Sequence, residues 1–311
     1  MDRLLALEQE IKAQCPTLML RQNEKMAKHT SFRIGGPARL MAFPKTEQEL
    51  SLLCRLAAAN GVTPYIMGNG SNLLVADKGI DGFVIQTFDG LSALRTLDDG
   101  VLFAGSGVLL SRVATFAKRQ GLSGLEFAHG IPGTVGGAAT MNAGAYGGEM
   151  KDIVFKTEFC DLLTGEMGTV EGDAHAFVYR GSAFSKGGRV VTGVYFRLTP
   201  GSPEAIGKQM DALSRRRRES QPLDLPSAGS TFKRPQGAFA AALIDQAGLK
   251  GLQVGGARVS DKHGGFVVNA GGATCKDVLE LIAQVKRQVQ EQFGVLLELE
   301  VKVWGMEPPC L

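Results

Sequence analysis

A stretch of twenty residues, His129–Gly148, carries seven glycines and almost no charge, and no other segment limits the possible folds as strongly. Glycine permits positive φ and lets the backbone approach another group closely. Backbone N–H groups exposed in this way form a concavity that suits an anion such as a diphosphate. The alternative is a tight, buried connection between two elements, and the stretch alone leaves both interpretations open.

A second glycine-rich turn, GNGSN at Gly68–Asn72, favours the ligand-binding interpretation. It follows the apolar run Tyr65–Met67, which is typical of the end of a strand. Two such turns, far apart in the sequence, are expected to converge on one pyrophosphate. Neither turn has the spacing of a P-loop or of the dinucleotide fingerprint G-x-G-x-x-G.

Composition excludes several classes of protein. The chain has 311 residues, 44% of them hydrophobic and 21% charged, which is typical of a globular protein of two or three domains. A net charge of +3 is too small to imply a nucleic-acid partner. No apolar run approaches the roughly 18–20 residues of a membrane helix, and the start lacks the pattern of a signal peptide. Five scattered cysteines without C-x-x-C argue against disulfides and a metal site. We therefore expect a cytoplasmic protein that binds neither membranes nor nucleic acid.

Periodicity and capping residues predict the elements. Helices are expected near the N-terminus, before an irregular lead-in to residue 28, and then at 44–61, 109–120, 204–219, 238–247 and 274–294. Strands are expected at 64–67, 73–75, 82–87, 101–104, 153–163, 189–198 and, with clear alternation, 295–303. This order predicts an α+β protein with domains at 1–92, 93–200 and 201–311.

Several motifs give the chain a specific resemblance. HTSFRIGGPA (29–38), GNGSNLLVADKGIDGFVI (68–85) and GIPGTVGGAATMNAGAYGGE (130–149) resemble the UDP-N-acetylenolpyruvoylglucosamine reductase family. YRGSAF (179–184), SAGSTFKRP (227–235) and LELEVKV (297–303) extend the resemblance over nearly the whole chain.

The resemblance implies an FAD-binding fold of the vanillyl-alcohol-oxidase (para-cresol methylhydroxylase) type. Two α+β subdomains would bind FAD, and a C-terminal α+β domain would bind the substrate. The implied reaction is NADPH-dependent reduction of UDP-N-acetylglucosamine enolpyruvate to UDP-N-acetylmuramate through FAD, in peptidoglycan precursor synthesis. The implied cofactor contacts lie in the two glycine-rich turns: Gly68, Asn69, Gly70, Ser71, Asn72, Gly130, Ile131, Pro132, Gly133, Gly136 and Gly137.

Three residues match the catalytic positions of the family. From the residues alone, Arg180 is a surface arginine, Ser230 a loop serine, and Glu300 a charge on the polar face of a strand. The resemblance implies instead that Arg180 holds the enolpyruvyl carboxylate, that Ser230 delivers a proton to the substrate carbon, and that Glu300 stabilises developing charge. Glu298 is the nearest competitor of Glu300, which is preferred because it directly precedes a valine.

The substrate loop resembles the shorter form of the enzyme, without an additional tyrosine loop. Tyr146, Lys233 and Asn269 are the implied contacts of the UDP-sugar substrate, and a monomer is expected. Two other functions remain to be separated from this one. The first is another flavin oxidoreductase on the same fold, and the second is a non-catalytic nucleotide or RNA binder that uses the basic run Arg215–Arg218.

Overall fold

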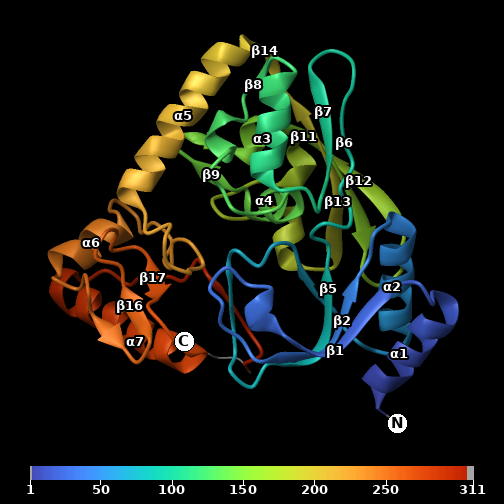
Figure 1. Cartoon of the computed structure of the whole chain (residues 1–311), viewed down its shortest axis with the longest axis horizontal. Helices are drawn as coiled ribbons and strands as arrows, with labels where there is room; N and C mark the ends of the chain where they lie inside the picture. The colour runs from blue at the N-terminus through green and yellow to red at the C-terminus, as the bar shows by residue number, and fades with distance from the viewer. Residues whose placement is uncertain (1, 307–311) are drawn as a thin grey trace. The chain divides into compact units, whose positions relative to one another are not determined.

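The computed structural model describes residues 2–306 (Figure 1). Its helices are α1 Arg3–Gln14, α2 Glu47–Ala59, α3 Leu110–Arg119, α4 Val135–Met141, α5 Pro203–Ser220, α6 Ala240–Gln246 and α7 Cys275–Phe293. Its strands are β1 Met19–Lys25, β2 Pro37–Phe43, β3 Tyr65–Met67, β4 Leu73–Val75, β5 Ile80–Gln86, β6 Leu94–Thr96, β7 Val101–Gly105, β8 Leu122–Ser123, β9 Gly144–Ala145, β10 Gly148–Glu149, β11 Val154–Asp161, β12 Met167–Glu171, β13 Arg189–Arg197, β14 Thr199–Pro200, β15 Gln253–Val254, β16 Ala257–Val259, β17 Val267–Asn269 and β18 Lys302–Trp304.

The strands form small sheets. The two largest have the orders β1-β2-β5-β3 and β12-β11-β13-β7-β6, and the second is antiparallel throughout. A three-stranded sheet has the order β15-β16-β17, and β18 pairs in parallel with β4. Helices and strands of both pairing types in one chain make the protein α+β, as the sequence predicts.

The chain divides into two compact units. The first comprises residues 1–22, 40–69 and 82–216, and the second comprises 23–39, 70–81 and 217–311. Both are assembled from three separate segments of the chain. The boundaries predicted from the sequence, at 92 and 200, stay a prediction.

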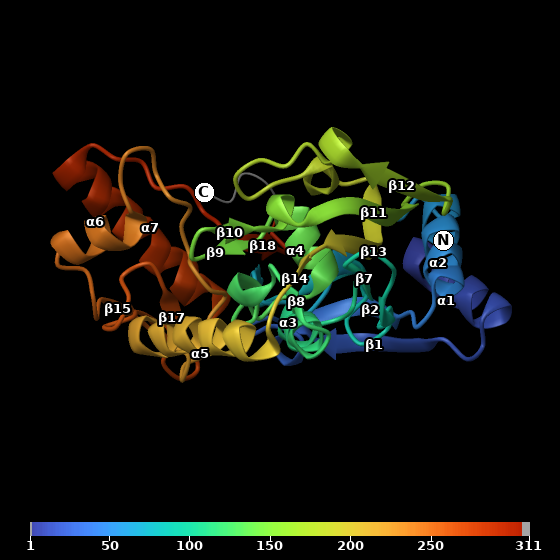
Figure 2. The ribbon, with the colours of Figure 1, turned by 90° about the horizontal axis from the view of Figure 1, so that it is seen from above.

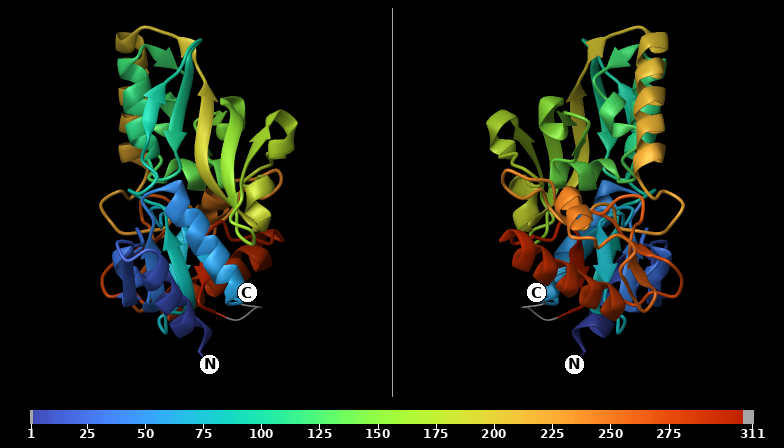
Figure 3. Two further views of the ribbon diagram at one scale, coloured as in Figure 1. Left: turned by 90° about the vertical axis from the view of Figure 1, so that its right-hand side faces the viewer. Right: turned by 90° about the vertical axis from the view of Figure 1, so that its left-hand side faces the viewer.

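In the first unit, α4 packs on β13 and β7 of the five-stranded sheet (Figure 1). Buried apolar side chains of α3, α4, β7 and β13 form one core there. A second core lies between α1 and α2, which run side by side (Figure 3), and includes Phe83 of β5 and Cys160 of β11.

In the second unit, α7 packs on β15 and β16 and against α6 (Figure 2). Its buried stripe follows the predicted helical period: Val278, Leu281, Ile282, Val285 and Val289. Phe293, the last residue of α7, is 37% exposed.

Three predicted elements differ from the structure. Residues 19–25, expected to be irregular, form β1, although only two of their seven side chains are half-buried and the rest are exposed. The predicted strand 295–303 is regular only at Lys302–Trp304, preceded by one antiparallel bridge between Leu299 and Phe232. The glycine-rich stretch 129–148, where the sequence predicts no helix, contains α4, whose Val135, Ala138 and Ala139 are buried in the core of the first unit.

Asp77 ties two distant segments of the second unit together. Its carboxylate accepts hydrogen bonds from the N–H groups of Cys275 at 2.7 Å and Lys276 at 3.1 Å, the first two residues of α7. The next cap is local, because Thr274 and Asp277 form a capping box. The first N–H groups of α7 are therefore satisfied partly by the distant Asp77 and partly by the local capping box.

We expect Asp77→Ala to destabilise the protein by about 1–2 kcal/mol, the usual effect of losing an N-cap acceptor. Asp81→Ala is the matched control, because the side chain of Asp81 is 84% exposed and makes a surface ion pair with Arg39. Urea unfolding of both variants measures the difference. Equal stability of the two would show that the bonds to α7 contribute nothing.

Candidate active site

The two glycine-rich turns meet in the first unit. Asn69 Nδ2 donates a hydrogen bond to the carbonyl oxygen of Pro132 at 2.8 Å. A Cβ built on Gly68 would lie 2.1 Å from Thr134 Oγ1, so no side chain fits at position 68. The predicted convergence is thus present for Gly68 and Asn69 on one side and Pro132–Thr134 on the other. Residues 70–72 belong to the second unit.

Two successive glycines at the start of α4 have different surroundings. A Cβ on Gly136 would lie 2.8 Å from the Cβ of Ser106, the residue after β7, so packing there requires glycine. A Cβ on Gly137 would meet only Thr134 Oγ1, at an ordinary 3.6 Å, and Gly137 is exposed. Contacts within the protein therefore explain the glycine at 136 and leave the one at 137 unexplained.

Arg180 lies at the tip of a tight turn. The N–H of Val178 donates to Gly181 O at 3.0 Å, and the N–H of Gly181 donates back to Val178 O at 3.2 Å. Arg180 has a φ of +55°, a conformation that non-glycine residues seldom adopt. Its guanidinium carbon lies 4.9 Å from the ring centroid of Tyr179. The half-buried Arg180 is therefore held in a defined, strained backbone conformation.

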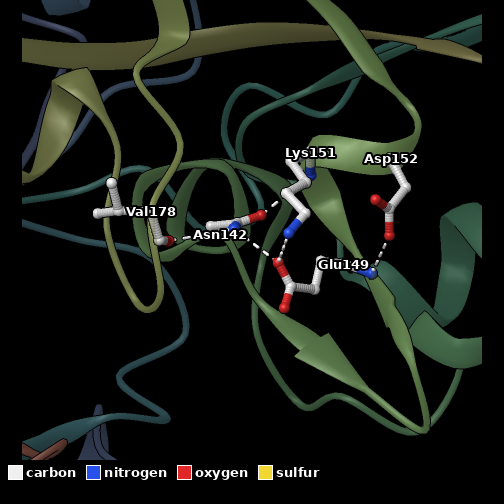
Figure 4. A network of polar contacts seen from close by, with 5 residues as sticks. All are labelled: Asn142, Glu149, Lys151, Asp152 and Val178. Atoms are coloured by element: carbon white, nitrogen blue, oxygen red, sulfur yellow. Dashed lines mark hydrogen bonds and ion pairs between the residues drawn. The ribbon is translucent and has the colours of Figure 1, made fainter.

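The end of α4 is joined to this turn through one buried amide (Figure 4). Asn142, the left-handed C-cap of α4, donates through Nδ2 to Val178 O at 3.1 Å and to Glu149 Oε2 at 3.0 Å. Its Oδ1 accepts from the N–H of Lys151 at 2.9 Å. All three hydrogen bonds of this side chain are therefore directed at neighbours outside α4.

Glu149 is the acidic member of the same network. The hydrogen bond from Lys151 contributes most to lowering its pKa, and the amide of Asn142 and the positive charge of Arg180 lower the pKa further. Glu149 is therefore ionised at neutral pH, within electrostatic range of Arg180.

Tyr146 occupies the two-residue turn between β9 and β10, with a φ of +54°. The guanidinium carbon of Arg216 lies 5.3 Å from its ring centroid, so one arginine of the basic run is used inside the first unit. Within residues 2–306, the buried Tyr146 hydroxyl has no hydrogen-bond partner, and the same holds for the hydroxyls of Ser106 and Thr192.

Ser230 and Glu300 lie on neighbouring extended segments of the second unit. The N–H of Glu300 donates to Thr231 O at 2.9 Å, so the residue after Ser230 is paired with Glu300. Asn72 Nδ2 donates to the backbone oxygen of Glu300 at 3.1 Å. Ser230 and Glu300 are both half-buried. The structure thus brings three predicted site residues, Asn72, Ser230 and Glu300, into one part of this unit.

The other predicted substrate contacts of this unit have partners within it. Lys233 Nζ forms an ion pair with Glu298 Oε2 at 3.0 Å, and its N–H donates to Glu298 O. Glu298, the competitor of Glu300, is exposed, and its carboxylate is paired with this lysine. Asn269 Oδ1 accepts from the N–H groups of Gly271 and Ala273 and stabilises that turn.

The histidines have structural contacts. His129 Nδ1 lies 3.2 Å from Ser214 Oγ, and the Nδ1 of His263 accepts from the N–H of Gly265. His175 is buried: its Nδ1 lies 2.9 Å from Gly172 O and its Nε2 lies 2.9 Å from Thr157 Oγ1. Because a carbonyl only accepts, Nδ1 carries a proton, and because burial lowers the pKa of His175, Nε2 carries none at neutral pH and accepts from the threonine. His175 is thus a neutral anchor of the loop that leads to Arg180.

Comparison with known proteins agrees with this geometry. The model of an FAD binding domain matches residues 38–171, and that of the UDP-N-acetylenolpyruvoylglucosamine reductase C-terminal domain matches 221–304. UDP-N-acetylenolpyruvoylglucosamine reductase of Agathobacter rectalis is 49% identical over 308 residues, covering 95% of this chain and 97% of that protein. The chain belongs to the UDP-N-acetylenolpyruvoylglucosamine reductase family. Membership confirms the resemblance drawn from the motifs and makes the chain an oxidoreductase with an FAD-binding domain.

Further relatives extend the match. The reductase of Clostridioides difficile is 46% identical over 286 residues, covering 92% of this chain and 93% of that protein. The crystal structure of the reductase from Thermus caldophilus superposes with a TM-score of 0.76 at 38% identity, covering 93% of this chain and 99% of that one. The FAD-binding fold predicted from the sequence is therefore confirmed.

Among helices in the described part of the chain, none has the length and apolar character to cross a bilayer.

Asn142, Glu149 and Thr134 lie within the motif at 130–149, but the sequence did not single them out as site residues. A signal for Asn142 exists, because asparagine after a run of small residues is typical of a left-handed helix C-cap. Recognising it requires recognising α4 first.

Burial lowers the pKa of His175 in the folded protein. Below about pH 6.5 the unfolded chain therefore binds a proton that the folded chain resists, so stability is full above that pH and is lost as pH falls further. We expect the free energy of unfolding to drop between pH 7.5 and pH 5, and to drop less in His175→Gln. Urea titrations at both pH values measure this. An equal drop in parent and variant would show that His175 does not contribute.

Proposed function

We propose that this protein reduces UDP-N-acetylglucosamine enolpyruvate to UDP-N-acetylmuramate, using NADPH and bound FAD, in peptidoglycan precursor synthesis. The observation that carries the proposal is that one chain contains both an FAD binding domain and the reductase C-terminal domain, in a sequence that also contains Arg180, Ser230 and Glu300. A plain nucleotide or RNA binder has no need of this combination. The monomeric state and cytoplasmic location stay predictions.

Features of the first unit fit FAD. Gly137 offers an exposed backbone surface that no contact within the protein requires to be free of a side chain. The buried hydroxyls of Ser106, Thr192 and Tyr146, without partners among the described residues, are donors that a bound molecule can satisfy. Residues 68–69 and 130–137 of this unit would hold the cofactor. The chemistry that bound FAD supplies is transfer of a hydride equivalent from NADPH to the terminal carbon of the enolpyruvyl group.

Side chains of the protein would then stabilise the negative charge that develops on the substrate and supply one proton to it. Hydride addition leaves negative charge on the adjacent carbon and its carboxylate. The planar guanidinium of Arg180 can bind a carboxylate through two parallel hydrogen bonds. Glu300 would stabilise the developing charge as a hydrogen-bond donor, or through a group that it polarises. Protonation of the carbon by Ser230 completes the lactyl ether, so the product gains one hydride and one proton.

Substitutions at two neighbouring glycines test where the cofactor lies. We expect Gly136→Ala to destabilise the protein by about 1–3 kcal/mol, because its Cβ would overlap Ser106. Gly137→Ala should keep or slightly raise stability, since alanine favours a helix. Gly137→Val should lose most of the flavin on purification, because its side chain would occupy the ligand's approach. Thermal unfolding and the flavin-to-protein absorbance ratio are the measurements. Full flavin content in Gly137→Val would place the cofactor elsewhere.

Ser230→Ala tests the proton donor. We expect NADPH to reduce the enzyme-bound flavin at close to the parental rate, while the enol ether reoxidises it about 10²–10⁴-fold more slowly, the range for one positioned acid. Ser230→Cys, which keeps an ionisable hydrogen, should recover part of this loss. Stopped-flow absorbance separates the two half-reactions. Parental reoxidation in Ser230→Ala would assign the proton to another group.

A further inference from the structure

We propose that Asn142 is a positioning residue for Arg180: its amide fixes the Arg180 turn to the end of α4 and so sets where the substrate carboxylate is held. The inference rests on the proposed function and deepens it, because it names a residue through which Arg180 acts. Figure 4 shows the amide between its partners.

The turn is bound on both sides of Arg180. Before it, Val178 O accepts from Asn142 Nδ2 at 3.1 Å. After it, the hydroxyls of Ser182 and Ser185 both donate to Thr140 O, at 2.9 and 2.7 Å. Thr140 and Asn142 lie at the end of the helix that begins with the glycines proposed to contact FAD. A single short helix therefore links the proposed cofactor contact to the arginine.

Asn142 suits this task because its environment leaves it little freedom. The residue is 1% exposed and has a left-handed backbone conformation, with φ of +42°. The amide nitrogen donates to both Val178 O and Glu149, and the amide oxygen accepts from the Lys151 N–H. Because both polar atoms of the amide are hydrogen-bonded, the side chain has one fixed orientation, and this orientation fixes the backbone at Val178.

Glu149 adds charge to the same arrangement. It orients the Asn142 amide through Oε2, and the ammonium of Lys151 lies 3.0 Å from the same oxygen. The positive charge of Arg180 is the smallest of the causes that lower the pKa of Glu149, so this carboxylate lies within electrostatic range of the guanidinium. Asn142 thus acts on the Arg180 turn through its bond to Val178 O, and Glu149 acts by orienting the Asn142 amide.

The test is a charge-conserving exchange, Asn142→Asp with Glu149→Gln. The glutamine can donate to the aspartate, which restores the bond between the two positions and keeps the net charge. The aspartate has no amide hydrogen to donate to Val178 O, so the bond that fixes the turn before Arg180 is lost, while the two serine bonds to Thr140 O after it remain.

The chain offers a matched control elsewhere. Asn60 Nδ2 donates to Glu10 Oε2 at 3.0 Å and to Leu56 O at 2.9 Å, the same pairing of a carboxylate and a backbone oxygen. Asn60→Asp with Glu10→Gln makes the same exchange outside the network around Arg180. The free energy of unfolding of both double variants shows whether each exchange is tolerated by the fold.

We expect the exchange at 142 and 149 to leave flavin content and flavin reduction by NADPH within about twofold of the parent, because neither depends on the carboxylate. Reoxidation by the enol ether should slow about 100-fold, the usual effect of a misplaced catalytic group. A readout independent of turnover is binding. Affinity for UDP-N-acetylmuramate, which carries the carboxylate, should fall about 10- to 100-fold, while affinity for UDP-N-acetylglucosamine, which lacks it, should stay unchanged. The control exchange at 60 and 10 should change none of these values.

A double-mutant cycle tests whether the effect of the exchange on reoxidation depends on Arg180. In an Arg180→Ala background, where the arginine is no longer present to be positioned, the exchange should slow reoxidation by less than about twofold further. An equal slowing with and without Arg180 would overturn the inference, and so would parental reoxidation by the exchanged protein when Arg180→Ala is slow. If Arg180→Ala itself reoxidises at the parental rate, the role of Arg180 in the proposed function fails, and this inference fails with it.

Discussion

The contact between the turn at Gly68 and the first residues of α4 leaves no space for a side chain. A Cβ on Gly68 would lie 2.1 Å from Thr134 Oγ1, and two residues later Gly136 meets Ser106 with similarly little room. These approaches place the N-cap of a seven-residue helix against the residue that follows β3, and the helix itself against β7. The helix then presents Gly137 outward and Asn142 at its other end. The proposed cofactor contacts and the Arg180 turn therefore both depend on the same close packing.

Elements with a regular apolar period and clear caps could be predicted from the sequence. Thr46 caps α2 by accepting from the N–H of Glu49, and Thr274 and Asp277 form the capping box of α7. Helix α4 could not be predicted in this way, because its adjacent glycines disfavour a helix and its small side chains give no long apolar stripe. The segment 295–303 shows the opposite error. Its side chains alternate, but regular pairing along it is confined to β18 and one bridge.

The candidate site likewise contains residues that the sequence could indicate and residues that it could not. Glycines in two turns indicate close backbone approach, and the structure brings Gly68 and Asn69 against Pro132–Thr134. Arg180, Ser230 and Glu300 were indicated by family motifs, since no spacing along the chain relates an arginine in one loop to a serine in another. Asn142 depends on a hydrogen bond to a backbone oxygen, Val178 O, whose position only the folded chain defines.

The second unit has a consequence for the order in which the protein is made. Asp77, which caps α7, precedes Cys275 by 198 residues, and β4 must wait even longer for its partner β18. At roughly 5–20 residues per second, synthesis separates these segments by roughly 10–40 s. During that interval the nascent chain carries residues 23–39 and 70–81 without the remainder of their unit. Translation speed and chaperone access over this window therefore bear on the yield of folded protein.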